Sequence, residues 1–141
     1  MNGSAPAPLA FQMLGAVHEM EARLESALSQ AGLSLAKFGV LAKLAEAGEP
    51  LALGCLADRC SCVRSNMTQL VDRLEADKLV ERVDDPNDRR SIKAVLTGTG
   101  RSRYEEGVRL LDEAEREVFA RLAGPEQATL SRLLRTLQRD Q

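Results

Sequence analysis

Apolar residues recur at helical spacing through the first half of the chain. Between residues 9 and 30 they form one stripe with charged residues off it, which predicts an amphipathic helix. A second helix is expected after Ser34, whose hydroxyl can cap it, and should end at Gly48. A third, short helix fits residues 53–59, and a fourth is expected from about Val63 to Asp77. Two short helices joined by a few residues indicate a helix-turn-helix.

The spacing of apolar residues changes after the fourth helix. Residues 79–83 and 91–96 are short runs rich in Val, Ile and Leu, as expected of two β-strands. The segment between them, DDPNDRR at residues 84–90, is full of turn-forming residues. Together these features predict a β-hairpin with a long charged tip.

Two more helices are expected after the hairpin. Thr97 or Thr99 can cap a long helix that extends to Leu122, and Gly124-Pro125 separates it from a final helix. The predicted order of elements is α-α-α-α-β-β-α-α. This order corresponds to a mainly α fold, a winged helix-turn-helix flanked by additional helices.

Composition and charge narrow the choice of function. The chain has 141 residues, the length of one domain, and its few aromatic residues (3%) leave a core of Leu, Ala, Val and Met, which favours packed helices. The formal net charge of −2 gives no sign of nucleic-acid binding, so any basic surface must be local. There is no apolar run long enough to span a membrane, no secretory signal, and an odd number of cysteines, three, which does not indicate a disulfide framework. We therefore expect a cytoplasmic protein that contacts no membrane.

Several motifs together resemble the MarR family of bacterial transcription regulators. They are LVDRLE, the strand sequence LVER, DPNDRR and LTGTG, in this order, within a match that covers residues 9–138. The resemblance implies one MarR-type domain over residues 1–141 that forms an obligate dimer and releases DNA on binding a small molecule or on thiol oxidation. Within it, the resemblance implies dimerisation helices at 9–30 and 124–138, a winged helix-turn-helix lobe at 34–97 and a connecting helix at 98–122.

The fourth helix is predicted to present a polar face to DNA. In the major groove Arg can bond guanine, Asn and Gln can bond adenine, and Thr can meet a thymine methyl group. No acidic residue occurs from Arg59 to Val71, so this segment is locally positive. Val63 stands where family members often carry a small hydroxyl residue, which leaves Ser61 or Ser65 to cap the helix. The candidate DNA-contacting residues are Arg64, Ser65, Asn66, Thr68, Gln69 and Arg73, and the alternative interpretation is a solvated polar face.

The hairpin tip supplies a second group of candidate DNA contacts. Arg89 and Arg90 follow Asp88 directly. A guanidinium group on a narrow loop can enter the minor groove, where negative potential is concentrated. The resemblance implies that Arg90 is the inserted residue and that Asp88 braces its side chain. The alternative is a surface turn with an ordinary Asp–Arg pair.

These features predict a homodimeric, sequence-specific DNA-binding regulator, most often a repressor in this family. Its expected partners are a double-stranded, pseudo-palindromic operator, a second copy of the chain, and a small-molecule, redox or metal signal that releases DNA. The dimer would form through apolar residues such as Leu9, Phe11, Met13, Leu130, Leu134 and Leu137. The alternative is an interaction module that has lost DNA binding. An enzyme is not expected, because no catalytic motif accompanies the single histidine, His18.

The resemblance also implies an effector pocket between the dimerisation helices and each DNA-binding lobe. Candidate lining residues are Met13, Val17, Met20, Phe38, Leu41 and Tyr104. Ordinary core packing of the same residues is the alternative, because Met and Leu at helical spacing need no ligand. The identity of the effector stays open at this stage.

The three cysteines, Cys55, Cys60 and Cys62, fall within eight residues, which suggests a sensing role. Clustered thiols can hold a soft metal or metalloid such as Zn(II), Cu(I) or As(III), and no other cofactor is expected. Cys62 is the candidate reactive thiol, because Arg59 and Arg64 on either side of it favour the thiolate. The resemblance places Cys60 and Cys62 at apolar packing positions and Cys55 at an exposed one, so plain packing is the alternative.

Overall fold

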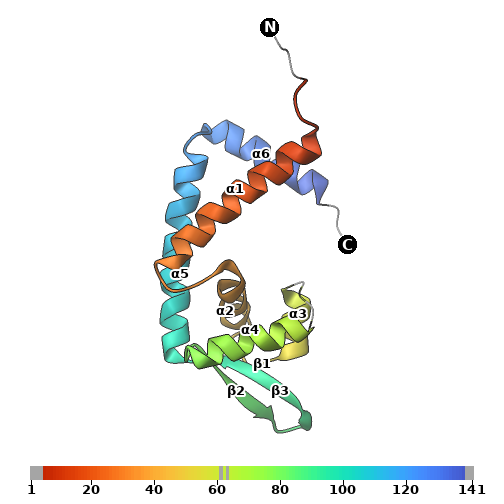
Figure 1. Ribbon diagram of the computed structural model, residues 1–141, viewed down its shortest axis with the longest axis vertical. Coiled ribbons are helices and arrows are strands. Elements are labelled where there is room, and N and C mark those ends of the chain that lie inside the picture. The colour runs from red at the N-terminus through yellow and green to blue at the C-terminus, as the bar shows by residue number, and fades with distance from the viewer. Residues whose placement is uncertain (1–4, 61, 63, 139–141) are drawn as a thin grey trace.

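The computed structural model describes residues 5–60, 62 and 64–138, and it confirms a mainly helical winged helix-turn-helix (Figure 1). Its elements are α1 (Leu9–Ser29), α2 (Leu35–Ala47), β1 (Leu51–Ala52), α3 (Leu53–Arg59), α4 (Arg64–Ala76), β2 (Val80–Asp85), β3 (Asp88–Leu96), α5 (Gly98–Phe119) and α6 (Gly124–Leu137). The apolar pattern predicts each helix of the described residues. It misses β1, because a strand of two residues is too short to show an alternating pattern.

The ends of α2 and the start of α5 lie at residues that the sequence marks as caps. Ser34 Oγ accepts a hydrogen bond from the Lys37 backbone N–H at 3.1 Å. Gly48 ends α2 with a φ of 66°, in the left-handed region that glycine adopts without strain. Thr97 caps α5, since its Oγ1 accepts a hydrogen bond from the Gly100 backbone N–H at 2.9 Å. These predicted helix boundaries are therefore confirmed.

The strands form one antiparallel sheet in the order β1-β3-β2. The prediction of a long charged tip over residues 84–90 is wrong, because β2 continues to Asp85 and β3 begins at Asp88. Only Pro86 and Asn87 form the turn. Turn-forming residues are tolerated here in strands because most of them, including Asp84 and Asp88, are exposed and need not pack into the core.

The register between β2 and β3 is interrupted close to the turn. Asp84 pairs with Ile92, whereas the next residue, Asp85, pairs with Asp88. Residues 89–91 of β3 therefore lie in an irregular stretch that the regular ladder does not include. Residues 89–91, which the sequence suggested for a longer loop, lie in this irregular part of β3 instead.

The core of the lobe is built from aliphatic side chains, as the composition predicts. The largest fully buried side chains come from α1 to α4 and from the residues that begin the hairpin: Leu28, Val40, Leu41, Leu56, Met67, Val71, Leu74, Leu79 and Val80. They form one continuous cluster, so the helix-turn-helix and the base of the hairpin share a single core.

Two glycines let α5 approach the lobe closely. A Cβ atom on Gly100 would lie 1.9 Å from the Leu79 carbonyl oxygen, and one on Gly107 would lie 2.8 Å from Cδ2 of Phe38. Phe38 also stacks on Tyr104, with ring centroids 5.5 Å apart. The first half of α5 is therefore fixed against both the hairpin base and α2.

The far end of α5 extends away from the lobe, and α6 turns back from it (Figure 1). Apolar side chains in this part of the molecule are exposed: Leu9 is 82% exposed, Phe11 67% and Leu137 65%. In α1, only Leu28 is fully buried. The predicted apolar stripe of α1 thus forms a helix, but most of it is left uncovered by the described residues of this chain. None of the described helices is both long enough and apolar enough to cross a membrane.

Candidate nucleic-acid interface

Helix α4 separates its apolar residues from its polar ones. Met67, Val71 and Leu74 are fully buried beneath it. The other face is exposed and carries Ser65, Asn66, Thr68, Gln69 and Arg73, so the predicted polar face is a real surface. The side chain of Arg64, together with Ser61 and Val63 at the expected start of the helix, lies outside the described part of the structure.

Arg82 on β2 joins the hairpin to α4. Its Nη1 donates a hydrogen bond to Glu75 Oε1 at 3.0 Å, and its Nη2 pairs with the Asp72 carboxylate. The Arg82 backbone N–H donates to Glu75 Oε2 at 3.1 Å, and Nη2 also reaches the Thr68 carbonyl oxygen at 3.5 Å. Charge-assisted contacts of this kind fix the orientation of α4 relative to the hairpin.

The same contacts change the charge that α4 presents. Burial lowers the pKa of the Arg82 guanidinium, but hydrogen bonds and charge interactions with Asp72 and Glu75 outweigh burial and raise that pKa above its ordinary value. The permanent cation offsets one of the two negative charges of Asp72 and Glu75, which reduces their repulsion of phosphate. Arg82 was not among the sequence predictions. The available signal was a pair of carboxylates three residues apart on one helix, followed by an arginine in the next strand.

The hairpin tip exposes both Arg89 and Arg90. Asp88 Oδ1 accepts a hydrogen bond from the Arg90 backbone N–H at 2.9 Å, and Asp85 Oδ1 accepts one from the Asn87 backbone N–H at 2.9 Å. In this structure Asp88 holds the backbone of Arg90, and the expectation that it braces the Arg90 side chain stays a prediction. In a turn this short, an Asp carboxylate lies close to the backbone amide two residues on.

Two further contacts hold the lobe together around α4. Lys37 Nζ in α2 lies 2.9 Å from Asp77 Oδ2, just beyond the end of α4. Arg103 Nη1 in α5 donates to the Ala31 carbonyl oxygen at 2.8 Å, in the connection between α1 and α2. The first contact ties the end of α4 to α2, and the second ties α5 to the connection that precedes α2.

The arrangement of α4 and the hairpin is one that can fit duplex DNA. Figure 1 shows the β2–β3 hairpin extending past α4, at the end of the molecule opposite α1 and α6. The major groove is about 12 Å wide and admits an α-helix, and a hairpin beside that helix can reach the adjacent minor groove. The exposed polar side chains of α4 and the arginines of the tip therefore lie at the same end of the molecule.

The three cysteines are half-buried thiols that pack against the core. Cys55, which was expected at an exposed position, is partly covered, because the short helix α3 lies against that core. Burial raises the pKa of the Cys60 thiol; Lys43 lowers it and Cys62 raises it, with a net upward effect. Among the residues that the structure describes, no three His, Cys, Asp or Glu side chains come together as metal ligands. The redox and metal roles of the cysteines stay predictions.

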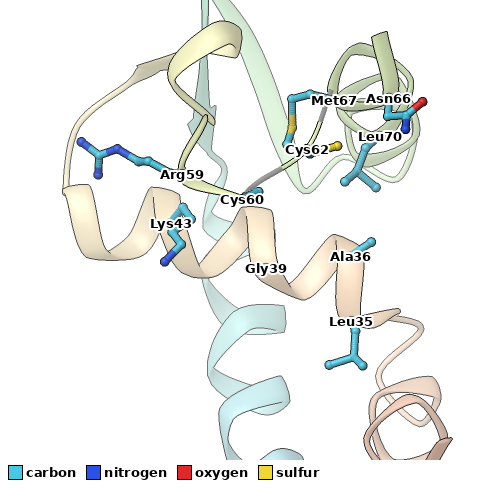
Figure 2. A pocket seen from close by; sticks show the side chains of 10 residues that line it. All are labelled: Leu35, Ala36, Gly39, Lys43, Arg59, Cys60, Cys62, Asn66, Met67 and Leu70. Atoms are coloured by element: carbon cyan, nitrogen blue, oxygen red, sulfur yellow. The ribbon is translucent and has the colours of Figure 1, made fainter. Parts of the chain in front are cut away.

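A cavity of about 690 Å³ lies between α2 and the helix-turn-helix (Figure 2). Cys60 and Cys62 line it, together with cationic, amide and apolar side chains that include Lys43, Arg59, Asn66 and Leu70. It adjoins the first turns of α4, and Asn66 belongs both to its wall and to the exposed face of that helix.

The six residues predicted to line an effector pocket do not line this cavity. Leu41 is fully buried in the core, Phe38 and Tyr104 stack on each other, and Met20 is half-buried. Met13 and Val17 lie on the uncovered part of α1, where they are 43% and 47% exposed. A pocket that includes both the packed residues and the exposed residues of α1 would need surfaces from beyond this chain. The predicted effector pocket therefore stays a prediction.

Two kinds of comparison with known proteins agree with this geometry. The sequence profile of the MarR family matches residues 31–91. The uncharacterized HTH-type transcriptional regulator YsmB of Bacillus subtilis is 31% identical over 113 residues, which cover 80% of this chain and 77% of that one. The HTH-type transcriptional repressor Rv2887 of Mycobacterium tuberculosis is 29% identical over 134 residues, which cover 95% and 96%.

Comparison with solved structures also indicates a MarR-like fold. A mutant MarR from Escherichia coli, crystallised in complex with operator DNA, matches with a TM-score of 0.84 at 26% identity, over 94% of this chain and 95% of that one. The sequence relationship to YsmB extends well beyond the helix-turn-helix, and the fold agrees over nearly the whole chain. The chain belongs to the MarR family of winged helix-turn-helix transcription regulators and is not an enzyme.

Proposed function

We propose that this protein is a homodimeric repressor that binds a pseudo-palindromic DNA operator through α4 and the hairpin tip, and that a chemical signal releases it. Helix α4 is called the recognition helix from here on. One observation carries the proposal: Arg82 clamps the exposed polar helix to a hairpin whose tip exposes Arg89 and Arg90. Helix α4 can then contact DNA bases while the hairpin contacts the DNA backbone, and Arg82 holds the two elements in a fixed relative position.

The recognition helix supplies the base contacts in this proposal. Asn66 and Gln69 have amides that can bond adenine, and Arg73 has a guanidinium that can bond guanine. Ser65 and Thr68 add hydroxyl groups to the same exposed face. Arg82 pairs with both carboxylates of the helix and offsets one of their two negative charges, so the approach of phosphate is opposed less strongly there.

The hairpin supplies the contacts that hold the protein on the duplex irrespective of sequence. Arg90 is the proposed minor-groove residue, and Arg89 is a neighbouring phosphate contact. Asp85 and Asp88 accept hydrogen bonds from backbone amides of the tip, which hold the start of the strand that carries both arginines. The net charge of −2 for the whole chain does not oppose this, because phosphate responds to charge within about 10 Å.

The dimer forms, in this proposal, through the uncovered apolar faces of α1 and α6. Leu9, Phe11 and Leu14 are exposed on α1, and Leu133 and Leu137 are exposed on α6. Several large apolar side chains exposed at one end of a molecule are typical of a protein interface. A two-fold dimer places two recognition helices about one turn of DNA apart, which predicts half-sites separated by about 10 base pairs.

The test is a fluorescence-anisotropy titration of labelled DNA from the protein's own promoter region. Arg90→Ala should weaken binding to all sequences. It should also reduce the slope of log K against log salt concentration by about 1, because one phosphate contact is lost. Gln69→Ala should weaken binding only where its base pair is correct, by about 1–3 kcal/mol. Arg121→Ala, an exposed arginine beyond the end of α5, is the matched control and should bind as the wild type does.

Two results would argue against the proposal. If Arg90→Ala and Gln69→Ala bind with the affinity of the wild type, the recognition surface has been placed wrongly. If the wild type shows no salt-dependent binding to any fragment of that region, the protein is better described as an interaction module with a DNA-binding fold.

A further inference from the structure

The DNA-binding lobe is joined to the α1–α6 end of the molecule at two places. One is α5, which runs from the hairpin base to α6, and the other is the short connection between α1 and α2, residues 30–34 (Figure 1). In the proposed dimer the exposed apolar residues of α1 and α6 meet a second copy of the chain. The direction in which α1 leaves the lobe therefore decides where each recognition helix lies relative to the other.

Arg103 on α5 holds the α1 side of this connection. Its Nη1 donates a hydrogen bond to the Ala31 carbonyl oxygen at 2.8 Å, across 72 positions of the sequence. Gly32 leaves room for the guanidinium group, since a Cβ atom there would lie 3.3 Å from Nη1. The cation also lies near the negative end of the α1 dipole. Arg103 comes from between Gly100 and Gly107, where α5 approaches the lobe closely, so it ties the end of α1 to the lobe.

Glu25 on α1 holds the α2 side of the same connection. Its Oε1 accepts a hydrogen bond from the Leu35 backbone N–H at 2.8 Å. Leu35 is the first residue of α2, so its amide has no acceptor within its own helix. The Ser34 hydroxyl accepts from a different amide, that of Lys37. A carboxylate at this point also suits the positive end of the α2 dipole.

The apolar packing at this junction is confined to one end of α1. Within that helix only Leu28 is fully buried, and the next buried side chains, Ala31 and Leu33, belong to the connection. These three side chains anchor the junction in the lobe core. A helix anchored over so short a length can tilt about its anchored end. The bonds of Arg103 and Glu25 resist that tilt, because they join α1 and its connection to two different helices of the lobe.

A small tilt at the junction has a large effect at the far end of α1. The helix has 21 residues and is about 30 Å long, at about 1.5 Å per residue. A tilt of about 6° therefore displaces its far end by about 3 Å. Successive base pairs of duplex DNA are about 3.4 Å apart, so this displacement corresponds to about one base pair of half-site spacing. Side chains that fix the tilt can thus affect operator recognition without contacting DNA.

We propose that Arg103 and Glu25 are positioning residues for operator recognition, which fix the angle between α1 and the lobe and thereby the half-site spacing that the dimer prefers. This inference rests on the proposed function, since it needs a dimer that binds two half-sites. Neither residue belongs to the recognition helix or to the hairpin. Their loss should broaden the range of accepted spacings and weaken binding at the preferred one.

The first experiment compares operators that differ only in spacing. Duplexes from the promoter region carry the native spacing or one base pair more or less, and fluorescence anisotropy gives the affinity of the full-length protein for each. The wild type should prefer one spacing. In Arg103→Met and in Glu25→Ala the ratio of affinities for the preferred and altered spacings should fall by about fivefold, the equivalent of one hydrogen bond. Arg109→Met, which removes an exposed arginine of the same helix, should keep the wild-type ratio.

The ratio separates positioning from a loss of folded protein. Partial unfolding reduces binding to every spacing by the same factor and leaves the ratio unchanged. Glu25 is exposed, so Glu25→Ala should fold even if Arg103→Met does not. Glu25→Gln keeps an oxygen acceptor and Arg103→Lys keeps a cationic donor, so both should restore part of the spacing preference. A wild-type ratio in Glu25→Ala or in a folded Arg103→Met would overturn the inference.

A second measurement tests the contact at α2 without DNA. Hydrogen exchange of the Leu35 amide, followed by NMR, should be about fivefold faster in Glu25→Ala than in the wild type, because the amide loses its acceptor. Arg109→Met should exchange as the wild type does. Equal rates in the wild type and in Glu25→Ala would show that Glu25 does not hold α2 in solution, and the inference would fail.

The two measurements also separate this inference from the proposed function. If the wild type prefers one spacing and the variants keep that preference, the inference is overturned and the proposed function stands. A wild type that binds all spacings equally well also overturns the inference. A wild type with no DNA affinity removes the proposed function and this inference with it, whatever the exchange rate of the Leu35 amide.

Discussion

The DNA-binding lobe and the α1–α6 end of the molecule use the same residue types in opposite ways. In the lobe, Leu56 and Leu74 are fully buried by neighbouring elements of the same chain. At the other end, Leu9, Phe11 and Leu137 are exposed. Both regions show the helical spacing of apolar residues equally well, because that spacing reports the existence of an apolar face and not what covers it. The lobe therefore owes its stability to one chain, whereas the far end depends on a second copy in the account proposed above.

The largest expected effect comes from truncating a core residue of the lobe. Leu74→Ala should lower the free energy of unfolding by about 2–5 kcal/mol, because a fully buried side chain leaves a cavity. Phe11→Ala should instead change how strongly stability depends on protein concentration. Urea denaturation at two protein concentrations distinguishes these effects. Equal, concentration-independent losses in both variants would show that α1 is covered within its own chain.

A smaller loss is expected from closing the space between α5 and the hairpin. Gly100→Ala places a Cβ atom against the Leu79 carbonyl oxygen and should cost about 1–3 kcal/mol. Gly98→Ala is the control in the same helical turn, where a Cβ atom has no neighbour within 4 Å. It should raise the melting temperature slightly, since alanine favours helix. Similar melting temperatures for the two variants would mean that the close approach is absent in solution.

The clamp between the two parts of the DNA-binding surface gives a third prediction. Arg82→Met should reduce stability by only about 1 kcal/mol, because its partners are substantially exposed. Its effect on operator affinity should be greater, because Asp72 and Glu75 are left unpaired beside phosphate. Arg82→Lys keeps the charge but not the forked geometry, so it should recover part of the affinity. Anisotropy titrations should show the highest operator affinity for the wild type, a lower one for Arg82→Lys and the lowest for Arg82→Met. Equal affinities for these three proteins would rule out the clamp.

The smallest expected effect concerns the reactivity of one thiol. Because burial raises the pKa of Cys60, less thiolate is present in the folded protein than in the unfolded chain at the same pH. Iodoacetamide should therefore alkylate Cys60 more slowly when folded, with a rate that keeps rising with pH above 9.0. The measurement uses a variant in which Cys55 and Cys62 are serine. Lys43→Met should slow alkylation further, and faster alkylation would contradict the assigned cause.

Much of the lobe could be predicted from local signals in the sequence. Ser34, Gly48 and Thr97 mark helix ends through hydrogen bonds or backbone conformation that depend on near neighbours alone. The polar face of the recognition helix follows from its period in the same way. These features need no knowledge of distant contacts, which is why the structure agrees with them.

The features that escaped prediction depend on residues brought together from different elements. The four contacts of Arg82 require β2 to lie along the recognition helix, and the turn at Pro86-Asn87 depends on an irregular register with β3. The cavity between α2 and the helix-turn-helix is likewise formed by side chains far apart in the sequence. Periodicity contains no information on such pairings.

The most direct test of the central claim is the stoichiometry of the protein on its promoter DNA, measured by sedimentation equilibrium. The account predicts a dimer in free solution and two chains on each operator duplex, with half-sites about one helical turn apart. Phe11→Ala should weaken the dimer and, at low concentration, DNA binding with it. A monomer that binds one half-site with full affinity, or a dimer with no salt-dependent DNA affinity, would contradict the account.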